Sequence, residues 1–306
     1  MLDITVVIAT YNRPQLLINA ISSVLNQEYK NFIFVVSDNS SNNDTFYLLK
    51  EKGLLDKFEY RKKNNLLAYE HFNEIVAEIK TKYFVMFHDD DIMFPNMLGA
   101  LYDSISSDES LIAVGCNNYF FNGDEKARVM NLKKSDDLLF SSKEDIIPRY
   151  FGNTWKAVPF PSYIYNVEMI REENIIYTTK AGKYSDVIWL MDLVEVGRIK
   201  WLAEPLMLYR IHPAQDSGQF SFCDYHKLLR YVAALSDSNS SLILNFRIKL
   251  LYTAMVNKLS IRLSAFSIKQ VALLYRYSPS YYLPKYIKIL FIKIIKRTLK
   301  KCKIMS

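Results

Sequence analysis

The chain has 306 residues, a mass of 35.8 kDa and a net charge of +7. Half of the residues are hydrophobic and 23% are charged, a composition that excludes a wholly disordered chain and allows one large domain or two smaller ones. Residues 238–306 contain 14 basic and no acidic residues, so the first 237 residues carry a net charge of −7. This asymmetry predicts an anionic partner for the C-terminal quarter.

Short apolar runs alternate with helical periodicities through the first 116 residues. Buried strands are predicted at 4–10, 32–37, 83–87 and 111–116, with a short strand at 58–61. Helices are predicted at 14–25, about 45–52, 72–79 and 97–105. The alternation predicts a Rossmann-like α/β fold, with a mostly parallel open sheet and flanking helices.

Polar residues follow three of these strands directly, at 10–13, 38–39 and 88–91. Ligands of open α/β sheets bind beyond the carboxyl ends of the strands. We therefore expect the three polar clusters to converge on one crevice.

The acid cluster at 88–91, which reads HDDD, is the strongest chemical signal in the chain. Three adjacent carboxylates repel one another unless a cation is bound, and hard divalent cations prefer oxygen ligands. An acidic, solvated turn is the alternative, but the metal interpretation is favoured directly after an apolar strand. No GxGxxG follows the first strand and no GxxxxGK[ST] occurs, which disfavours nicotinamide dinucleotides and a P-loop.

The periodic pattern weakens between residues 117 and 185. Trp155, Tyr163 and Tyr165 in this stretch are candidates for stacking on an acceptor sugar, with buried packing as an equal alternative. A strongly periodic helix then opens at Ser185-Asp186 and is predicted to end at Gly197.

Four segments resemble the family 2 glycosyltransferases, in the order and approximate spacing of that family. Residues 6–14 read VVIATYNRP and are similar to the family's opening, and Asp38 and the acid cluster follow. Residues 184–190 (YSDVIWL) resemble the segment that bears the catalytic base. Residues 204–215 (EPLMLYRIHPAQ) are similar to the usual end of the catalytic domain.

This resemblance implies a GT-A fold over residues 1–218, followed by a basic helical region at 219–306. It implies a metal-dependent, inverting transfer of a sugar from a nucleotide-sugar, most simply a UDP-sugar. Asp186 would be the general base. The implied nucleotide-binding residues are Thr10, Tyr11, Asn12, Arg13, Asp38, Asp89, Asp90 and Arg210, and the implied ligands of Mn²⁺ or Mg²⁺ are Asp91, Asp89 and His212.

Two residues depart from the family's commonest pattern. His88 stands where another Asp is frequent, and Ser185 stands where Glu often precedes the base. The chemistry still suits Asp186, because an attacking hydroxyl must lose a proton and a positioned carboxylate can accept it. A capping role is the alternative for Asp186, and a helix N-terminus would lower its basicity.

The basic C-terminal region ends in an amphipathic pattern. On a helical wheel Lys285, Lys293, Lys296, Arg297 and Lys300 gather on one side, and Ile287, Phe291, Ile294 and Ile295 gather on the other. The pattern predicts a helix that lies in the headgroup region of an anionic membrane, with packing on its own domain as the alternative. No nucleic-acid-binding module is evident.

The resemblance and the basic helix together suggest a lipid-linked saccharide acceptor, a role in surface polysaccharide assembly, and a peripheral location on the cytoplasmic face of the cell membrane. The sequence shows no signal peptide, no apolar transmembrane run and no disulfide or zinc pattern among its 3 cysteines. A non-catalytic sugar-nucleotide or membrane-binding protein on the same fold is one rival. A sugar nucleotidyltransferase is another, but it would be expected to carry a Gly-rich loop that residues 10–14 lack.

Overall fold

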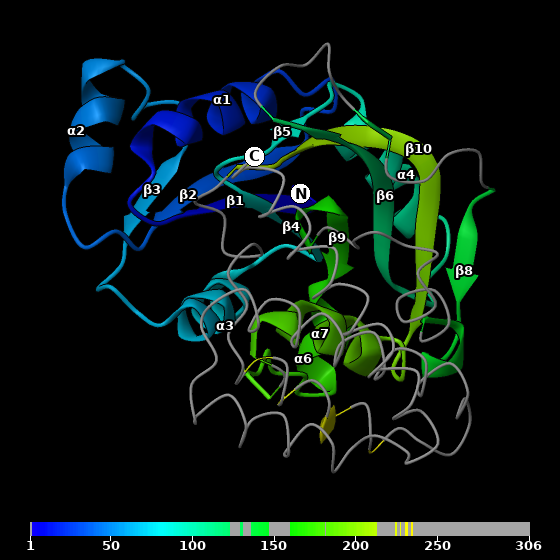
Figure 1. Ribbon diagram of the computed structural model, residues 1–306. Coiled ribbons are helices and arrows are strands. Elements are labelled where there is room, and N and C mark those ends of the chain that lie inside the picture. Colours follow the sequence, from blue (N-terminus) through cyan, green and yellow to red (C-terminus); the bar gives the residue numbers. More distant parts are fainter. Residues whose placement is uncertain are drawn as a thin grey trace, which may run out of the picture. The chain divides into compact units, whose positions relative to one another are not determined.

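The computed structural model describes residues 2–122, 129–130, 136–146, 160–180 and 182–212, together with residues 224, 227, 230, 231 and 234 (Figure 1). The chain divides into two compact units, one of Met1–Thr179 and Lys183–Gln219 and the other of Lys180–Gly182 and Phe220–Ser306. Apart from the five single positions, the predicted basic helical region at 219–306 lies outside the described residues, as does Trp155.

A 10-stranded sheet forms the centre of the first unit. Its strands are β1 (Ile4–Thr10), β2 (Phe32–Asp38), β3 (Glu59–Lys62), β4 (Tyr83–His88), β5 (Ile92–Met93), β6 (Leu111–Phe121), β7 (Val129–Met130), β8 (Leu138–Phe140), β9 (Tyr163–Asn166) and β10 (Arg198–Arg210). The order is β3-β2-β1-β4-β9-β6-β10-β5, with β7 paired to β6 and β8 to β10. β1, β2, β3 and β4 are parallel, as are β6 and β10, whereas β5, β7, β8 and β9 are antiparallel to their neighbours. The predicted α/β fold with flanking helices is confirmed, but the sheet is mixed and not mostly parallel, because the antiparallel strands β5, β7, β8 and β9 complete it.

The parallel register brings the ends of three strands to the same edge of the sheet. Thr10 of β1 pairs with Asp38 of β2, and Ala9 pairs with His88 of β4. β1 and β4 are buried on both faces, which explains their continuous apolar sequences. The polar residues that follow β1, β2 and β4 therefore leave the sheet side by side.

The sheet has helices on both sides. They are α1 (Pro14–Leu25), α2 (Asp44–Glu51), α3 (Ala68–Glu78), α4 (Met97–Ser106), α6 (Val167–Glu172) and α7 (Ser185–Leu193). The apolar faces of α1 and α4 belong to one core cluster with Ile4, Val6 and Ile8 of β1. In Figure 1, α3, α6 and α7 lie on the opposite side of the sheet from α1 and α2.

Two polar side chains of α1 fix the segment that follows the acid cluster. Ser23 Oγ accepts the N–H of Met93 (3.1 Å). Gln27 accepts the N–H of Leu98 (2.9 Å) and donates to the carbonyl oxygen of Phe94 (2.7 Å). Because Gln27 is fully buried, these bonds replace the water that its carboxamide has lost. α1 thus holds β5 and the start of α4 in a defined position.

Several elements differ from the sequence predictions in extent. β6 continues beyond residue 116 to Phe121, because it pairs with β10 along its length. α3 begins earlier than predicted, at Ala68, where the Glu70 carboxylate accepts the N–H of Leu67 (3.1 Å). α7 ends at Leu193 and not at Gly197. β9 and β10 were not predicted, and in β10 charged residues interrupt the apolar pattern.

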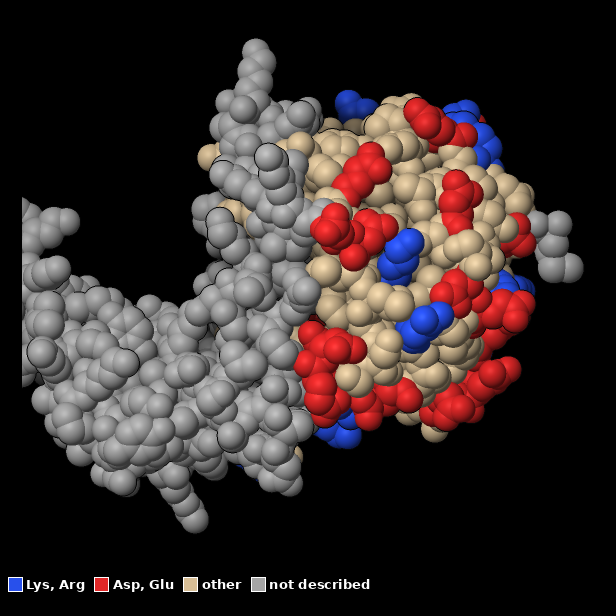
Figure 2. All heavy atoms as spheres, turned by 90° about the vertical axis from the view of Figure 1, so that its right-hand side faces the viewer, with Lys and Arg blue, Asp and Glu red and all other residues tan. Residues whose placement is uncertain are grey.

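The described part of the chain has a strongly acidic face. Figure 2 shows the side that lies to the right in Figure 1, where Asp and Glu side chains predominate over Lys and Arg. This agrees with the net charge of −7 of the first 237 residues. In the described ranges, no helix combines the length and the apolar character required to cross a bilayer.

Candidate active site

Thr10, the last residue of β1, and Arg13, which follows β1, contact the acid cluster directly. The Thr10 hydroxyl donates to Asp89 Oδ2 (2.6 Å). Arg13 forms ion pairs with Asp89 (Nη2 to Oδ1, 2.6 Å) and Asp90 (Nη1 to Oδ2, 3.0 Å). Because Asp89 is fully buried, the guanidinium offsets a charge that would otherwise be costly in the protein interior. The expected meeting of these two polar clusters is observed.

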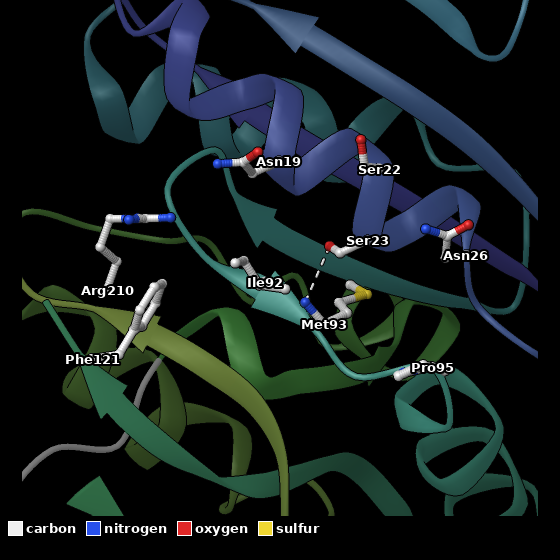
Figure 3. Close-up of a pocket in the computed structure, with 9 residues that line it drawn as sticks. All are labelled: Asn19, Ser22, Ser23, Asn26, Ile92, Met93, Pro95, Phe121 and Arg210. Atoms are coloured by element: carbon white, nitrogen blue, oxygen red, sulfur yellow. Dashed lines mark hydrogen bonds between the residues drawn. The ribbon is translucent and has the colours of Figure 1, made fainter. Parts of the chain in front are cut away.

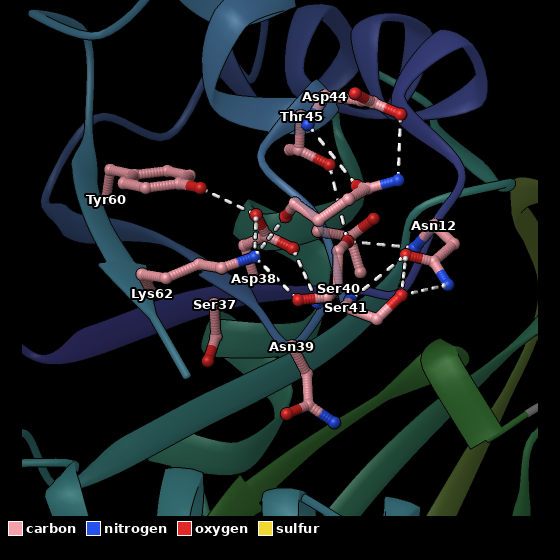
Figure 4. A network of polar contacts seen from close by, with 12 residues as sticks. Asn12, Ser37, Asp38, Asn39, Ser40, Ser41, Asp44, Thr45, Tyr60 and Lys62 are labelled. Carbon is pink, nitrogen blue, oxygen red and sulfur yellow. Dashed lines mark hydrogen bonds and ion pairs between the residues drawn. The ribbon is translucent and has the colours of Figure 1, made fainter. Parts of the chain in front are cut away.

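Asp38 is the centre of a second polar network (Figure 4). The carboxylate is fully buried, and its Oδ1 accepts the N–H of Ser40 (2.8 Å). Its Oδ2 accepts from the Tyr60 hydroxyl (2.6 Å) and from Lys62 Nζ (3.2 Å), which both lie on β3. Burial alone raises the pKa of Asp38, but the donors Ser40, Tyr60 and Lys62 outweigh it and hold the pKa below its usual value. Asp38 is therefore a firmly held anion.

The residues after β1 and β2 are joined to each other as well. Asn12 has a left-handed backbone (φ 53°), which its short polar side chain tolerates. Its N–H donates to Ser40 Oγ (2.8 Å), and its side-chain oxygen accepts the N–H of Ser41 (3.1 Å). Tyr11 beside it is 47% exposed, so its ring is available to a ligand at the strand ends.

His88, Asp90 and Asp91 form the candidate metal centre. One ligand atom from each lies within 4.8 Å of the others. Asp91 is 1% exposed, and its Oδ2 is buried without a hydrogen-bond partner, whereas its Oδ1 accepts the N–H of Arg210 (2.8 Å). A buried carboxylate oxygen that lacks a hydrogen bond and lies 3.9 Å from an imidazole nitrogen, beside a second carboxylate, fits a divalent cation. Asp89, which with His212 was also predicted as a ligand, is engaged instead by Thr10 and Arg13.

The cationic side chains around the acid cluster do not fully offset the burial and mutual repulsion of its three carboxylates. Burial raises the pKa of Asp89 to about 6, although Arg13 and Thr10 act in the opposite direction. Burial and the charge of Asp90 raise the pKa of Asp91 well above its usual value. The pKa of Asp90 is lowered, because His88, Arg13 and His212 outweigh the effect of burial. A bound cation would relieve this repulsion and keep all three carboxylates ionised.

Arg210 and His212 reach the acid cluster from the end of β10. Besides the bond from its N–H to Asp91, Arg210 donates from Nε to the carbonyl oxygen of Asp90 (2.8 Å). His212 Nε2 lies 3.0 Å from Asp90 Oδ2. The structure thus brings both residues to the cluster, and their roles toward a diphosphate or a metal stay predictions.

Asp186 lies in the first turn of α7 and is half-buried. Its Oδ1 accepts the N–H of Val187 (2.9 Å). Burial raises the pKa of Asp186 to about 6, although main-chain donors lower it. The expected loss of basicity at a helix N-terminus is thus outweighed by desolvation. A carboxyl with this pKa is ionised near neutral pH and can still accept a proton.

An aromatic cluster connects the surroundings of Asp186 with His88. Phe160 stacks on the His88 ring (6.1 Å between centroids) and contacts Tyr177 (5.8 Å). Trp189, three residues after Asp186, contacts Tyr177 (5.9 Å) and Phe72 (5.2 Å). Burial and then the charge of Asp186 raise the pKa of Tyr177. The candidate base and the candidate metal centre therefore border one aromatic cluster.

For the aromatic residues, the sequence analysis left one question open and missed two contacts. Tyr163 and Tyr165 are 1% and 0% exposed in β9, so the packing interpretation holds for them. Phe160 and Tyr60 were missed. Tyr60 could have been found, because it is two residues from Lys62 on a strand and therefore shares its face toward Asp38. Phe160 lies in an aperiodic stretch and carried no such signal.

A mixed α/β sheet with helices on both sides, and with an acid cluster at the ends of its parallel strands, has the architecture of the GT-A type. Residues 5–173, more than half of the chain, match the model of Glycosyl transferase family 2, and the chain belongs to this family. It is 26% identical over 226 residues to an "Uncharacterized glycosyltransferase" of Haemophilus influenzae, covering 71% of this chain and 68% of that protein. It is also 26% identical over 219 residues to one of Methanocaldococcus jannaschii, covering 70% and 72%.

Solved structures share the fold at low sequence identity. S. aureus TarS 1–349 in complex with UDP-GlcNAc has a TM-score of 0.67 and 12% identity, covering 90% of this chain and 82% of that chain. The mannosyltransferase PcManGT of Pyrobaculum calidifontis, in complex with GDP-Man and Mn²⁺, has a TM-score of 0.57 and 13% identity, covering 97% and 87%. The family and the GT-A fold suggested by the sequence are thereby confirmed.

Proposed function

We propose that the protein transfers a sugar from a nucleotide-sugar to a hydroxyl group of a saccharide acceptor, in a metal-dependent reaction that inverts the anomeric carbon. The observation that carries this proposal is the presence of two kinds of carboxylate beside one aromatic cluster. One kind is the acid cluster, in which Asp91 has a buried oxygen without a hydrogen-bond partner, 3.9 Å from His88 Nδ1. The other is Asp186, a half-buried carboxyl whose pKa is raised to about 6.

The proposed donor is a UDP-sugar bound at the ends of β1, β2 and β4. The nucleotide-binding residues in this proposal are Thr10, Tyr11, Asn12, Arg13, Asp38, Asp89, Asp90 and Arg210. The complexes of TarS with UDP-GlcNAc and of PcManGT with GDP-Man support a nucleotide-sugar donor. To accept a hydrogen bond from uracil, Asp38 would have to exchange one of its present donors, Tyr60 or Lys62.

Mn²⁺ or Mg²⁺ would be held by Asp91 together with Asp90 and His88. The 4.8 Å grouping of their ligand atoms supports this set. His212 contacts Asp90 and is proposed as a further ligand of the cation. Asp89 is also proposed as a ligand, but to bind the cation its carboxylate would have to break its ion pair with Arg13. When bound, such a cation offsets the negative charge that develops on the departing diphosphate.

Asp186 is proposed to accept the proton of the acceptor hydroxyl. As the acceptor oxygen forms its bond to the anomeric carbon, the bond from that carbon to the diphosphate breaks, and the proton passes to Asp186. The aromatic cluster supports this role, because its low polarity disfavours the ionised carboxyl and so raises its affinity for a proton.

The acceptor is proposed to be a lipid-linked saccharide, in surface polysaccharide assembly at the cytoplasmic face of the cell membrane. The basic region at 219–306 would hold the protein on anionic lipid. The acidic face in Figure 2 would be repelled by the same anionic lipid. Full-length protein with Lys285, Lys293, Lys296, Arg297 and Lys300 replaced by Gln should lose binding to phosphatidylglycerol vesicles. Undiminished binding would contradict the membrane role.

The central test measures donor binding and metal dependence together. UDP-, GDP-, TDP- and CMP-sugars are compared by thermal shift with and without Mn²⁺, because a ligand that binds the folded protein raises its unfolding midpoint. We expect a UDP-sugar to give the largest rise in the unfolding midpoint. This rise should depend on Mn²⁺ and should be absent in Asp91→Asn. The matched control is Asp103→Asn, which neutralises an exposed carboxylate of α4. A shift that is equal in both variants would contradict the metal site.

Transfer itself separates an enzyme from a non-catalytic binding protein. Release of UDP is followed with lipid-linked saccharide acceptors under the conditions that give the largest shift. A nucleotide-sugar that binds but is never consumed with any acceptor would favour the non-catalytic rival.

A further inference from the structure

A pocket lies on the α1 side of the acid cluster (Figure 3). Its volume is about 390 Å³, toward the lower end of the range of small-molecule sites. The described residues that line it are Asn19, Ser22, Ser23, Asn26, Ile92, Met93, Pro95, Phe121 and Arg210. Of the residues proposed above to bind the donor, Arg210 alone is among them.

The cationic end of Arg210 is the most notable group in this pocket. Its Nε is occupied by the carbonyl oxygen of Asp90, and its guanidinium carbon lies 4.4 Å from the centre of the Phe121 ring. These two contacts fix the plane of the guanidinium. Its Nη groups have no hydrogen-bond partner in the described part of the chain. Figure 3 shows the guanidinium directed across the pocket toward the side chain of Asn19.

The opposite wall offers neutral hydrogen-bonding groups. Asn19 of α1 and Asn26, which directly follows α1, are exposed, and neither carboxamide has a partner among the described residues. Ser22 donates to the carbonyl oxygen of Ile18 (2.9 Å) and can still accept. The Ser23 hydroxyl is less available to a ligand, because it already donates to the carbonyl oxygen of Ala20 and accepts the N–H of Met93. The polar wall thus presents two carboxamides to whatever occupies the pocket.

The charge of the pocket favours an anion. No Asp or Glu occurs among the described residues that line it, so the Arg210 guanidinium is its only charged side chain there. The floor, formed by Ile92, Met93, Pro95 and Phe121, is apolar. A guanidinium whose two Nη groups are unused matches a phosphate or carboxylate group, and carboxamides suit hydroxyl groups.

We propose that this pocket binds a small polar molecule that carries an oxyanion, of the class of sugar phosphates and sugar acids. The oxyanion would accept hydrogen bonds from the Nη groups of Arg210. The body of the molecule would lie on the apolar floor and bond to Asn19 and Asn26. Among the described lining residues, this site shares Arg210 with the proposed donor site. The N–H and Nε of Arg210 hold Asp91 and Asp90, while its Nη groups would bind the oxyanion, so both sites can be filled together. The proposal does not depend on the sugar transfer proposed above.

Arg210 itself is unsuitable for the test, because it also holds Asp90 and Asp91. Asn19→Asp places a carboxylate opposite the guanidinium, where it would pair with Arg210 and repel an anion. The charge-matched control is Asn174→Asp, at an exposed position with a left-handed backbone (φ 51°) that Asp tolerates. Unfolding midpoints of both variants show whether they are folded, and Asn26→Asp is the second pocket variant.

Binding of glucose 6-phosphate, glucuronate and neutral glucose is measured by calorimetry in saturating UDP and Mn²⁺, so that the donor site is filled. We expect the two anions to bind the wild-type protein and Asn174→Asp, and glucose to bind at least tenfold more weakly. Asn19→Asp and Asn26→Asp should weaken both anions at least tenfold, and added salt should weaken them in the wild type.

Three results would overturn the proposal: equal affinity for glucose and glucose 6-phosphate, unchanged anion affinity in folded Asn19→Asp, or displacement of glucose 6-phosphate by UDP. Failure of the donor proposal is recognised separately. In that case UDP itself gives no binding signal, while glucose 6-phosphate still binds the wild type and not Asn19→Asp.

Discussion

Two sides of the candidate active site are built from different interactions. The acid-cluster side, residues 10–13, 38–41 and 88–91, is held by ion pairs such as Arg13 to Asp89 and Lys62 to Asp38. The aromatic side, formed by Phe72, Phe160, Tyr177 and residues 186–189, is held by ring contacts. Here Asp186 accepts from the main-chain N–H of Val187, with no ion pair among the described residues.

This difference matches the task proposed for each side. A nucleotide-sugar brings two phosphates, so the residues that receive it need fixed charges and a place for a cation. A general base needs a pKa close to the working pH, and an environment of low polarity supplies it. The comparison therefore predicts that charge changes and packing changes will affect different measured quantities.

The largest effect is expected from Asp186→Asn. Without a group to accept the proton, kcat should fall about 10²- to 10⁴-fold. Donor affinity should be unchanged, because the ion pairs of the acid-cluster side remain. The variant should unfold at the same or a higher temperature at pH 7, since a raised pKa means that the ionised carboxyl is disfavoured in the folded state. Near-normal turnover would remove Asp186 from the mechanism.

The next largest effect is expected on the free energy of unfolding, when a ring of the aromatic side is removed without any change in charge. Phe72 is 7% exposed and contacts Phe160 (5.3 Å), Tyr177 (4.6 Å) and Trp189 (5.2 Å). Phe72→Ala should lower the free energy of unfolding by about 3–5 kcal/mol, through lost transfer energy and the cavity that remains. The control is Tyr47→Ala, at a ring that is 64% exposed, with an expected loss below about 0.5 kcal/mol. Equal losses in urea unfolding would contradict the assigned packing.

The pH dependence of turnover examines the environment of Asp186. Because its pKa is about 6, the carboxyl is ionised and can accept a proton above that pH. Below it, the protonated fraction grows and kcat should fall about tenfold per pH unit. The residual activity of Asp186→Asn should lack this midpoint near pH 6. A wild-type midpoint near pH 4 would show that the aromatic side does not desolvate the base.

The acid-cluster side was largely predictable from the sequence, and the aromatic side was not. Thr10, Arg13, Asp38 and the Asp residues at 89–91 follow buried strands, and parallel strands bring their ends together whatever the helices do. Phe160 and Tyr177 are distant from Phe72 along the chain, and no periodicity relates them. Their contacts arise from the tertiary packing of α3 and α7, which a single sequence does not specify. Even on the predictable side, the sequence could not show that Arg13 pairs with both Asp89 and Asp90, or that Asp90 groups with His88 and Asp91.

The smallest effects are expected from a matched pair of carboxamides, one on each side. Asn39 directly follows Asp38, one of the proposed nucleotide-binding residues, and exchanges two hydrogen bonds with the main chain of Leu66 (2.8 and 2.7 Å). Asn73 of α3 exchanges two with the main chain of Tyr177 (both 3.0 Å), beside Asp186. Each Asn→Ala change should lower the free energy of unfolding by about 1–2 kcal/mol, because two neutral hydrogen bonds are lost.

Steady-state kinetics should distinguish the two variants although their stabilities are similar. Asn39→Ala loosens the loop before α3, so the KM for the donor should rise several-fold while kcat stays near the wild-type value. Asn73→Ala loosens the segment that carries Tyr177, so kcat should fall several-fold with little change in the donor KM. If both variants changed the same parameter, the two sides would act as one unit. The proposal that the charged side binds the donor and the aromatic side supports proton transfer would then be wrong.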